Sequence, residues 1–373
     1  MRPKDPFIGR EILGGQFLVL EKIGTGGMGS VYKASQPAMN RMVAIKILHP
    51  KLANRKDLTS RFRREARAMS QLTHPNTVKV FMYGEMEEDG SLYIVMEMLE
   101  GKNLNQAVRK DGPIPRERAI PILIQVCGAL QEAHDLGIVH RDLKPENIFL
   151  SRQNGQDYPK VLDFGLAKVT ERQMQPGSLI LTQEGMVFGT PEFMSPEQAQ
   201  GKTLDARSDI YSLAVILYEV LTGKLPFSAK SPMEYIQKHV TEPIIGLSER
   251  VADKRFPPEL DAVMARALAK KPEQRFQSAA DFAEALRPFG GVTAQQLPSL
   301  RAGDGASPRQ AVAGTGPALP EGPIGARPVA DVRGDRQGPP EKSTGPGLLL
   351  GVAALCLVAG VLLAVVVMRL MGR

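Results

Sequence analysis

Three glycines near the amino terminus have the spacing of a loop that can approach phosphate. Gly24, Gly26 and Gly29 form a GxGxxG pattern between two runs with strand character, FLVLEKI and SVYKA. Because glycine has no Cβ, a turn at these positions lets the backbone come close to a phosphate group. The pattern alone also fits an ordinary glycine-rich hairpin. A second strand follows it, whereas a dinucleotide-binding site expects a helix there.

The next candidate is a lysine inside an apolar strand. The run MVAIKIL is interrupted by Lys46, which can either reach water from an edge strand or hold nucleotide phosphates. A phosphate-binding lysine needs an anion to position it. The periodicity of DLTSRFRREARAMSQL predicts a helix with Phe62, Ala66 and Met69 on one face and Glu65 beside them. Glu65 is therefore either that anion or an ordinary solvent-exposed charge.

Three longer motifs follow in a fixed order: HRDLKPEN at 140–147, VLDFGLAK at 161–168 and FGTPEFMSPEQ at 188–198. With the glycine pattern and Lys46, this ordered set resembles the protein kinase superfamily. Within it, the chain is similar to the bacterial eukaryotic-like (Hanks-type) serine/threonine protein kinases that have a membrane anchor. The resemblance implies an α+β, bilobal protein kinase fold, in which an antiparallel sheet with one main helix precedes a mostly helical lobe.

By this resemblance, each residue of the motifs has an expected role. Asp142 accepts or orients the proton of the substrate hydroxyl, and Lys144 neutralises charge on the transferred phosphoryl group. Asn147 and Asp163 are the expected metal ligands. The expected metal is Mg2+, bound together with ATP, and Mn2+ is the alternative. The expected catalytic residues are Asp142, Lys144, Lys46 and Glu65.

The resemblance also implies an apolar slot for adenine. The Glu97 carbonyl and the Leu99 amide would bond the adenine edge, and Met96 would guard the pocket behind it. The expected nucleotide-binding residues are Ile23, Gly24, Gly26, Gly29, Val31, Ala44, Lys46, Met96, Glu97, Leu99 and Leu150. The apolar side chains of this set also fit an ordinary core, because a nucleotide slot is lined by core-like side chains.

Other motif residues have expected structural roles. His140 and Phe164 are expected to be packing residues of the core. Glu197 is expected to pair with Arg275, and Asp209 resembles the buried helix residue that anchors the backbone of the catalytic loop.

Regulation is expected in the segment that follows the second motif. Arg141 precedes the catalytic aspartate, where an arginine usually needs an anion to neutralise it. Ser178, Thr182 and Thr190 are the candidates to carry that anion as a phosphate group. The spacing of Thr182 from Thr190 is typical of the autophosphorylated threonine in this family. The alternative for Thr182 is a solvent-exposed loop threonine.

Composition divides the chain into stretches of different character. The formal net charge of +7 over 373 residues is spread along the chain without a basic stripe, which argues against nucleic acid as a partner. The two cysteines exclude a disulfide framework, and no aromatic residue follows Phe289. The predicted parts are an N-terminal extension (1–16), a kinase domain (17–289, with lobes 17–99 and 100–289), a Pro/Gly/Ala-rich disordered linker (290–347), a transmembrane helix (348–368) and a short tail (369–373).

The segment 348–368 has 21 uncharged residues, which as a helix span about 31 Å, the thickness of a bilayer core. The amino terminus lacks the apolar run of a secretory signal. We therefore expect a single-pass protein of the cytoplasmic (inner) membrane, with the kinase domain on the cytoplasmic side. Small residues four apart, such as Gly360 and Ala364, fit a homodimer through this helix, and the sequence leaves monomer and dimer open.

The expected activity is transfer of the ATP γ-phosphoryl group to Ser and Thr hydroxyls of proteins, including the chain itself, in membrane-anchored signalling. The alternative is a pseudokinase, a membrane-anchored scaffold that binds nucleotide or partners without turnover. A pseudokinase is disfavoured because all five residues expected for turnover are present: Lys46, Glu65, Asp142, Asn147 and Asp163.

Overall fold

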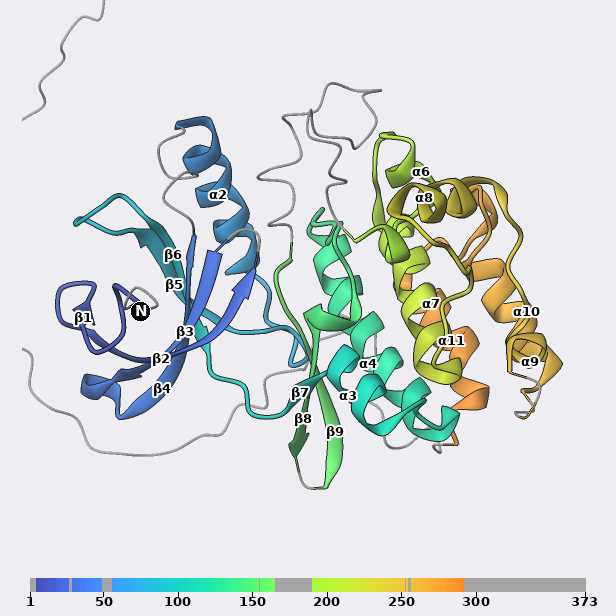
Figure 1. The fold of residues 1–373 in the computed structure, drawn as a ribbon, viewed down its shortest axis with the longest axis horizontal. Helices are drawn as coiled ribbons and strands as arrows, with labels where there is room; N and C mark the ends of the chain where they lie inside the picture. The colour runs from blue at the N-terminus through green and yellow to red at the C-terminus, as the bar shows by residue number, and fades with distance from the viewer. Residues whose placement is uncertain are drawn as a thin grey trace, which may run out of the picture. The chain divides into compact units, whose positions relative to one another are not determined.

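The structure is a computed structural model that describes residues 5–26, 29–48, 56–153, 155–164, 190–251, 253 and 256–291. Two lobes follow one another along the chain (Figure 1). The first lobe contains the blue sheet and α2. The second contains the green to orange helices and a small sheet formed by β7, β8 and β9.

The first lobe is an antiparallel sheet with one long helix. Its elements are β1 (Glu11–Ile12), β2 (Phe17–Gly26), β3 (Gly29–Gln36), the 3-10 helix η1 (Pro37–Met39), β4 (Arg41–Leu48), α2 (Lys56–Met69), β5 (Val80–Glu85) and β6 (Leu92–Glu97). The strand order is β1-β2-β3-β4-β6-β5. Because side chains alternate along a strand, β4 buries Val43, Ile45 and Ile47 on one face, in a cluster with Phe17 and Tyr93.

The other face of the sheet is covered by α2. Phe62 and Ala66 are fully buried and Met69 nearly so, and they share a core with Leu92 and Ile94 of β6. This confirms the predicted apolar face of the helix.

The glycine pattern forms the predicted hairpin between β2 and β3, in which Gly26 pairs with Gly29. A Cβ on Gly29 would lie 2.2 Å from the Ile47 carbonyl oxygen, so β4 passes too close for any side chain there. A Cβ on Gly26 would have no atom of the described residues within 4 Å, apart from its neighbours in the chain. Packing within the described residues therefore requires glycine at Gly29 and leaves room beside Gly26.

The second lobe is mostly helical. Its elements are β7 (Lys102–Asn103), α3 (Leu104–Asp111), α4 (Arg116–Asp135), η2 (Pro145–Asn147), β8 (Ile148–Gln153), β9 (Gln156–Val161), η3 (Pro191–Phe193), α6 (Pro196–Ala199), α7 (Ala206–Thr222), α8 (Pro232–Thr241), α9 (Leu247–Arg250), α10 (Pro258–Ala267), η4 (Pro272–Gln274), α11 (Ala279–Leu286) and η5 (Arg287–Phe289).

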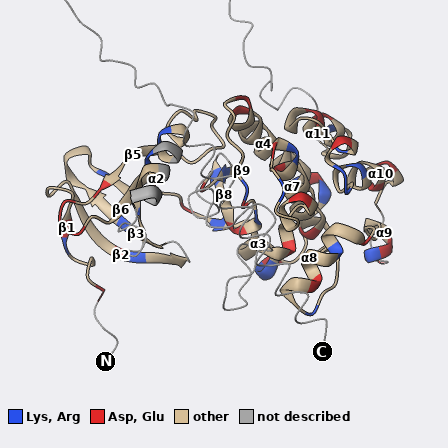
Figure 2. Cartoon of the chain, turned by 90° about the horizontal axis from the view of Figure 1, so that it is seen from above, with Lys and Arg blue, Asp and Glu red and all other residues tan. Residues whose placement is uncertain are grey.

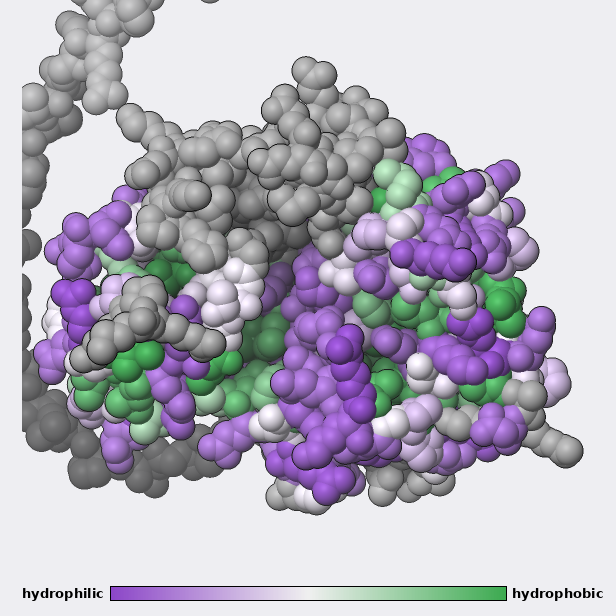
Figure 3. Space-filling model, viewed as in Figure 1, coloured by the Kyte–Doolittle hydropathy of each residue, from purple (hydrophilic) through white to green (hydrophobic). Residues whose placement is uncertain are grey.

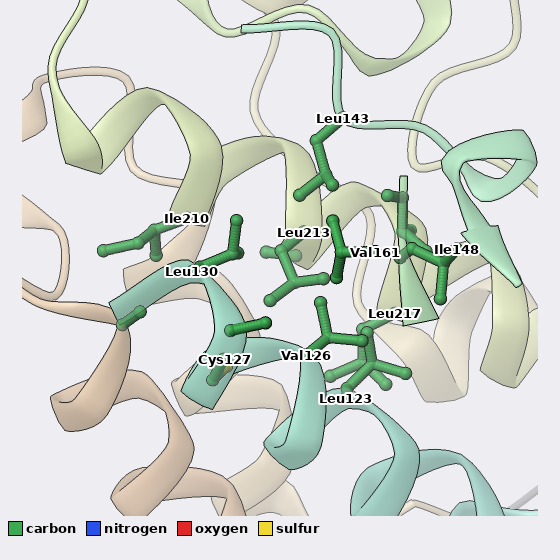
Figure 4. Close-up of a cluster of buried hydrophobic side chains, with 14 of the residues drawn as sticks. Leu123, Val126, Cys127, Leu130, Leu143, Ile148, Val161, Ile210, Leu213 and Leu217 are labelled. Carbon is green, nitrogen blue, oxygen red and sulfur yellow. The ribbon is translucent and has the colours of Figure 1, made fainter. Parts of the chain in front are cut away.

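The core of this lobe lies between α4 and α7. Figure 4 shows side chains of α4 meeting those of α7, with β8 and β9 closing one end. The buried side chains drawn there include Leu123, Val126, Leu130, Ile148, Val161, Leu213 and Leu217. Cys127 is buried in the same core, and burial raises the pKa of its thiol. Helix α7 runs through this core without interruption from its N-cap Asp205 to Gly223, where φ is 72°.

Hydrogen bonds join the two lobes, in addition to the covalent connection through the chain. Glu132 of α4 accepts hydrogen bonds from the backbone N–H groups of Thr73 and His74, at 2.9–3.1 Å. The Asn76 amide donates to the Pro159 carbonyl oxygen at 2.7 Å. The residues just after α2 are thus held to α4 and β9.

The predicted two-lobed α+β fold with an antiparallel first sheet is confirmed. Part of the predicted extension 1–16 joins that sheet, because β1 pairs with β2 and Asp5 forms a 3.0 Å ion pair with Lys22. The predicted segment 348–368 and almost all of the predicted linker lie outside the described residues. Among the helices that the structure describes, none has the length and apolar character needed to cross a membrane.

Candidate active site

The loop between α4 and β8 contains the first candidate residues. The Asn147 side-chain amide donates a 2.8 Å hydrogen bond to the Asp142 carbonyl oxygen, which closes the loop. The Lys144 Nζ atom lies 2.7 Å from Asp142 Oδ2, and 29% of the Asp142 side chain is exposed. A carboxylate and an ammonium group therefore lie side by side within reach of a substrate.

Asp209, in the first turn of α7, holds the backbone of this loop through hydrogen bonds. Its carboxylate accepts the backbone N–H groups of His140 and Arg141 at 2.8 and 2.9 Å, and His134 Nε2 lies 2.8 Å away. Burial would raise the pKa of Asp209, but the contacts with His134 and the Arg141 N–H hold that pKa below its ordinary value. Arg141 has φ of 70°, a strained conformation that these bonds stabilise. The predicted anchoring role of Asp209 agrees with this geometry.

A second ion pair connects the two lobes. The Lys46 Nζ atom of β4 lies 2.8 Å from Asp163 Oδ2, just after β9. Asp163 has φ of 58°, in the left-handed region that few residues other than glycine adopt. Burial would raise the pKa of Asp163, but the Lys46 ammonium group holds that pKa below its ordinary value. Lys46 is therefore bound to a candidate metal ligand in this structure.

The sequence predicts Glu65 as the partner of Lys46. Residue 65 lies within α2, but its side chain lies outside what the structure describes. The Lys46–Glu65 pair therefore remains a prediction, whereas the contact of Lys46 with Asp163 was not foreseen.

His140 and Phe164 are packing residues, as predicted. Neither ring is more than 1% exposed, and the two ring centroids are 5.0 Å apart. His140 Nε2 also lies 2.8 Å from the Leu162 carbonyl oxygen. These contacts place the residue before Asp163 directly against the catalytic loop.

The expected adenine-slot residues come from both lobes. Cross-strand pairing places Val31 opposite Gly24, and Ala44 opposite Met96. Ala44 is buried and Met96 half-buried. The remaining apolar candidates are Ile23, which is 45% exposed, and Leu150, which is buried.

The expected hinge has a hydrogen-bond donor available. Among the described residues, no group accepts the backbone N–H of Leu99, which lies between β6 and β7. The neighbouring Glu97 side chain is held by the backbone N–H of Lys79 and by Lys160 Nζ, both at 2.7 Å. Lys160 is a residue that sequence reasoning missed, because nothing in its local pattern indicates a contact with Glu97.

The chemistry of Asn147 and Asp163 fits a magnesium ion. Asn147 uses its amide nitrogen for the bond to the catalytic loop, so its amide oxygen remains available. Asp163 supplies carboxylate oxygens. Mg2+ prefers oxygen ligands and is commonly bound by one or two protein side chains together with substrate phosphates. Within the described part of the chain, no group of three or more His, Cys, Asp or Glu residues could hold a metal ion alone.

The regulatory candidates are only partly described. Thr190 Oγ1 lies 3.3 Å from Lys144 Nζ, which brings Thr190 to the catalytic loop. Arg141 is tied through its carbonyl oxygen to the Gln198 side-chain amide at 2.9 Å. Ser178 and Thr182 lie outside the described residues.

The 3-10 helix η3 is held by a histidine that sequence reasoning missed. His239 of α8 is fully buried, and its Nε2 lies 3.0 Å from the Glu192 carbonyl oxygen. Its Nδ1 lies 2.9 Å from the Tyr211 hydroxyl oxygen. Because a carbonyl oxygen only accepts, Nε2 donates and Nδ1 accepts from Tyr211. No spacing in the sequence predicts this arrangement, which joins three separate segments.

Comparison with known proteins agrees with this fold and these motifs. Residues 17–286 match the family described as protein kinase domain. Serine/threonine-protein kinase pkn3 of Myxococcus xanthus is 42% identical over 284 residues, 76% of this chain and 51% of that protein. Serine/threonine-protein kinase PknB of Mycolicibacterium smegmatis is 46% identical over 263 residues, 70% of this chain and 41% of that protein. The chain thus spans about half the length of the curated relatives it matches.

Solved structures show the same fold. The kinase domain of PknI from Mycobacterium tuberculosis matches with a TM-score of 0.57 and 29% identity, over 76% of this chain and 98% of that chain. Rad53 1-466 in complex with AMP-PNP matches with a TM-score of 0.60 and 25% identity, over 74% of this chain and 66% of that chain. Because the family match covers both lobes and the solved structures share the fold, the chain belongs to the protein kinase family.

Proposed function

We propose that this protein transfers the γ-phosphoryl group of ATP to serine and threonine hydroxyl groups of proteins. The observation that supports this most directly is the accessible Asp142 carboxylate with Lys144 Nζ at 2.7 Å. The relatives described above are named serine/threonine-protein kinases, and the Rad53 structure contains the ATP analogue AMP-PNP.

Each residue of the site can perform one part of this transfer. ATP with Mg2+ supplies the phosphoryl group and neutralises part of its charge when bound. Asn147 and Asp163 would hold the metal, and Lys46 would bind phosphate oxygens beside it. Asp142 accepts the hydrogen bond of the substrate hydroxyl and orients its oxygen, while Lys144 stabilises negative charge on the transferred group. Placement and charge therefore account for the chemistry.

The test is incubation of the full chain with γ-labelled ATP, Mg2+ and a protein substrate, beside Asp142→Asn. We expect label on serine or threonine with the parent and a loss of at least about a hundredfold with the variant. No label with either protein would favour the scaffold alternative. Label on tyrosine alone would contradict the proposed substrate class.

We further propose that the protein phosphorylates itself on Thr182. Support comes from the position of Thr182 in the segment before Thr190 and from the arginine that precedes Asp142. Thr182→Ala should lower kcat severalfold, and mass spectrometry of the parent should show phosphate on this residue. Equal kcat for the fully phosphorylated and fully dephosphorylated parent would contradict the idea.

The apolar segment 348–368 anchors the kinase in the cytoplasmic membrane in this proposal, with both lobes on the cytoplasmic side, where ATP is found. Its support is 21 consecutive uncharged residues. The full chain should remain with membranes after carbonate extraction, whereas a chain ending at residue 347 should be released. A full chain found in the soluble fraction would exclude the anchor.

A further inference from the structure

A groove of about 930 Å³ lies beside the segment that joins the two lobes. Its walls are α3, the start of α4 and the hairpin of β8 and β9, and Glu100 and Gly101 also line it. Leu150, an expected adenine-slot residue, also lines it, so the groove adjoins the proposed nucleotide site. The catalytic residues proposed above do not line it.

Cationic side chains dominate this surface, which we call the basic groove. They are Lys102, Arg109, Lys110, Arg118 and Arg152. The anionic side chains that line it are Glu100 and Asp157. Figure 2 shows Lys and Arg in α3 and β8, and Figure 3 shows strongly hydrophilic residues gathered over α3 and the β7–β9 sheet.

Two of these cations are already neutralised. Arg118 binds Asp157 through two hydrogen bonds of 2.7 and 2.9 Å, and Lys102 forms an ion pair with Asp111. The Arg118 contact is a bidentate arginine–carboxylate pair, which combines charge with directional hydrogen bonds. One wall of the groove thus already binds a carboxylate in this way.

The other three cations are exposed. Arg109, Lys110 and Arg152 form no ion pair with any described residue. Like charges close together repel, and a ligand of opposite charge relieves that repulsion. Among the described lining residues, two of the five cations are neutralised and three are not, whereas Glu100 is the single unpaired anion, so the groove keeps a net positive charge that is complementary to carboxylates.

Helix α3 also connects the basic groove to the catalytic loop. Asn105 of α3 donates a 2.7 Å hydrogen bond to Glu146, four residues after Asp142 in the sequence. A protein whose hydroxyl group lies at Asp142 can therefore place a second segment along α3 and in the groove. The groove has the size of a ligand pocket, which suits a short peptide segment.

We infer that the basic groove binds an acidic segment, rich in Asp and Glu, of the proteins that this kinase phosphorylates. This inference rests on the proposed kinase function for the identity of the partner as a substrate. The binding itself can be measured without catalysis. The carboxylates of the acidic segment contact Arg109, Lys110 and Arg152. Binding of this segment lowers the KM for the protein substrate and leaves kcat unchanged, because the catalytic residues do not line the groove.

The first experiment measures binding to the full chain by fluorescence anisotropy. The probes are a labelled peptide containing Asp and Glu but no Ser, Thr or Tyr, and the same peptide with Asn and Gln in their place. We expect the acidic peptide to bind about tenfold more tightly at low salt and to lose most of this advantage at high salt. Equal affinities for the two peptides would overturn the inference.

Variants locate the binding surface. Lys110→Gln combined with Arg152→Gln should weaken binding of the acidic peptide by about three- to tenfold. The control combines Lys230→Gln with Lys271→Gln, two exposed lysines outside the groove, and makes the same change in net charge. The control should bind like the parent. An equal loss in both double variants would show a general charge effect and overturn the assignment to the groove.

A kinase assay then connects binding to turnover. A peptide with one Ser and an acidic tail should show a several-fold lower KM than the same peptide with a neutral tail, at equal kcat, and the groove variant should abolish the difference. If neither peptide is phosphorylated, the proposed function fails, whereas the anisotropy experiment still decides whether the groove binds carboxylates. If both peptides are phosphorylated with equal KM values, the inference that the groove binds substrates is wrong, while the proposed kinase function stands.

Discussion

Arg275 holds Glu197 through two parallel hydrogen bonds of 2.7 Å, from Nη1 to Oε1 and from Nη2 to Oε2. The arginine side chain is fully buried and the carboxylate nearly so. Burial would raise the pKa of Glu197, but the Arg275 guanidinium holds that pKa below its ordinary value. The Ser208 hydroxyl also donates to Glu197 at 2.6 Å, so the carboxylate is well satisfied. This is the bridge that the sequence predicts.

Removing the arginine should be costly because it leaves a buried carboxylate without its cation. Arg275→Ala should lower the free energy of unfolding by about 3–5 kcal/mol, measured by urea denaturation. The matched control is Arg287→Ala, which breaks the exposed pair with Glu284 and should cost less than about 1 kcal/mol. Similar losses in both variants would contradict the special position of Arg275.

The two glycines that pair at the hairpin should respond differently to a methyl group. Gly29→Ala places a Cβ against the β4 backbone and should destabilise the fold by about 1–3 kcal/mol. Gly26→Ala adds a Cβ that meets no atom of the described residues, so the free energy of unfolding should stay within about 0.5 kcal/mol of the parent. If the loop approaches phosphate, Gly26→Ala should instead raise the KM for ATP severalfold. Unfolding curves and ATP titrations of both variants would decide, and equal destabilisation would refute the distinction.

The buried His239 should make the protein sensitive to acid. Burial lowers the pKa of His239 from 6.5 to about 4, so between these pH values the unfolded chain binds a proton that the folded protein does not. Stability is therefore fully present above about pH 6.5 and falls as the pH approaches 4. A shift of this size corresponds to up to about 3 kcal/mol. Urea denaturation at pH 4.5 and 7.5 should show this loss in the parent and a smaller one in His239→Gln.

Glu219 should have the opposite effect on stability. Burial, with a smaller contribution from the carboxylates of Glu146 and Glu192, raises the pKa of Glu219 from 4.5 to about 7, although Arg109 opposes the shift. Between these pH values the folded protein binds a proton that the unfolded chain has released, so stability falls as the pH rises from about 4.5 to 7. Glu219→Gln should gain up to about 3 kcal/mol relative to the parent on going from pH 5 to pH 8. A constant difference between the two proteins across this range would rule out a raised pKa.

Much of the fold follows from local signals that the sequence contains. The glycine spacing and the flanking strand residues predict the β2–β3 hairpin. The helical periodicity of Phe62, Ala66 and Met69 predicts the face of α2 that covers the sheet. In both cases the signal lies within one segment, where periodicity and glycine geometry decide the outcome.

Contacts between distant segments were predicted only where the family resemblance supplied them. The Glu197–Arg275 bridge and the Asp209 anchor are of this kind. The Lys46–Asp163 pair and the His239 bonds to Tyr211 and Glu192 were missed, because each depends on how separate segments pack. The positive φ angles of Arg141 and Asp163 were also missed, since strained backbone has no signature in residue type.

The described contacts between the lobes include side chains of the proposed active site, with a consequence for nucleotide binding. Glu132 accepts hydrogen bonds from Thr73 and His74, just after α2, and Lys160 donates one to Glu97 at the end of β6. The Lys46–Asp163 ion pair also joins the lobes, through two side chains that the proposed function assigns to phosphate and metal. Under that proposal, ATP with Mg2+ competes with this ion pair, because the two residues that would bind the phosphates and the metal are bound to each other.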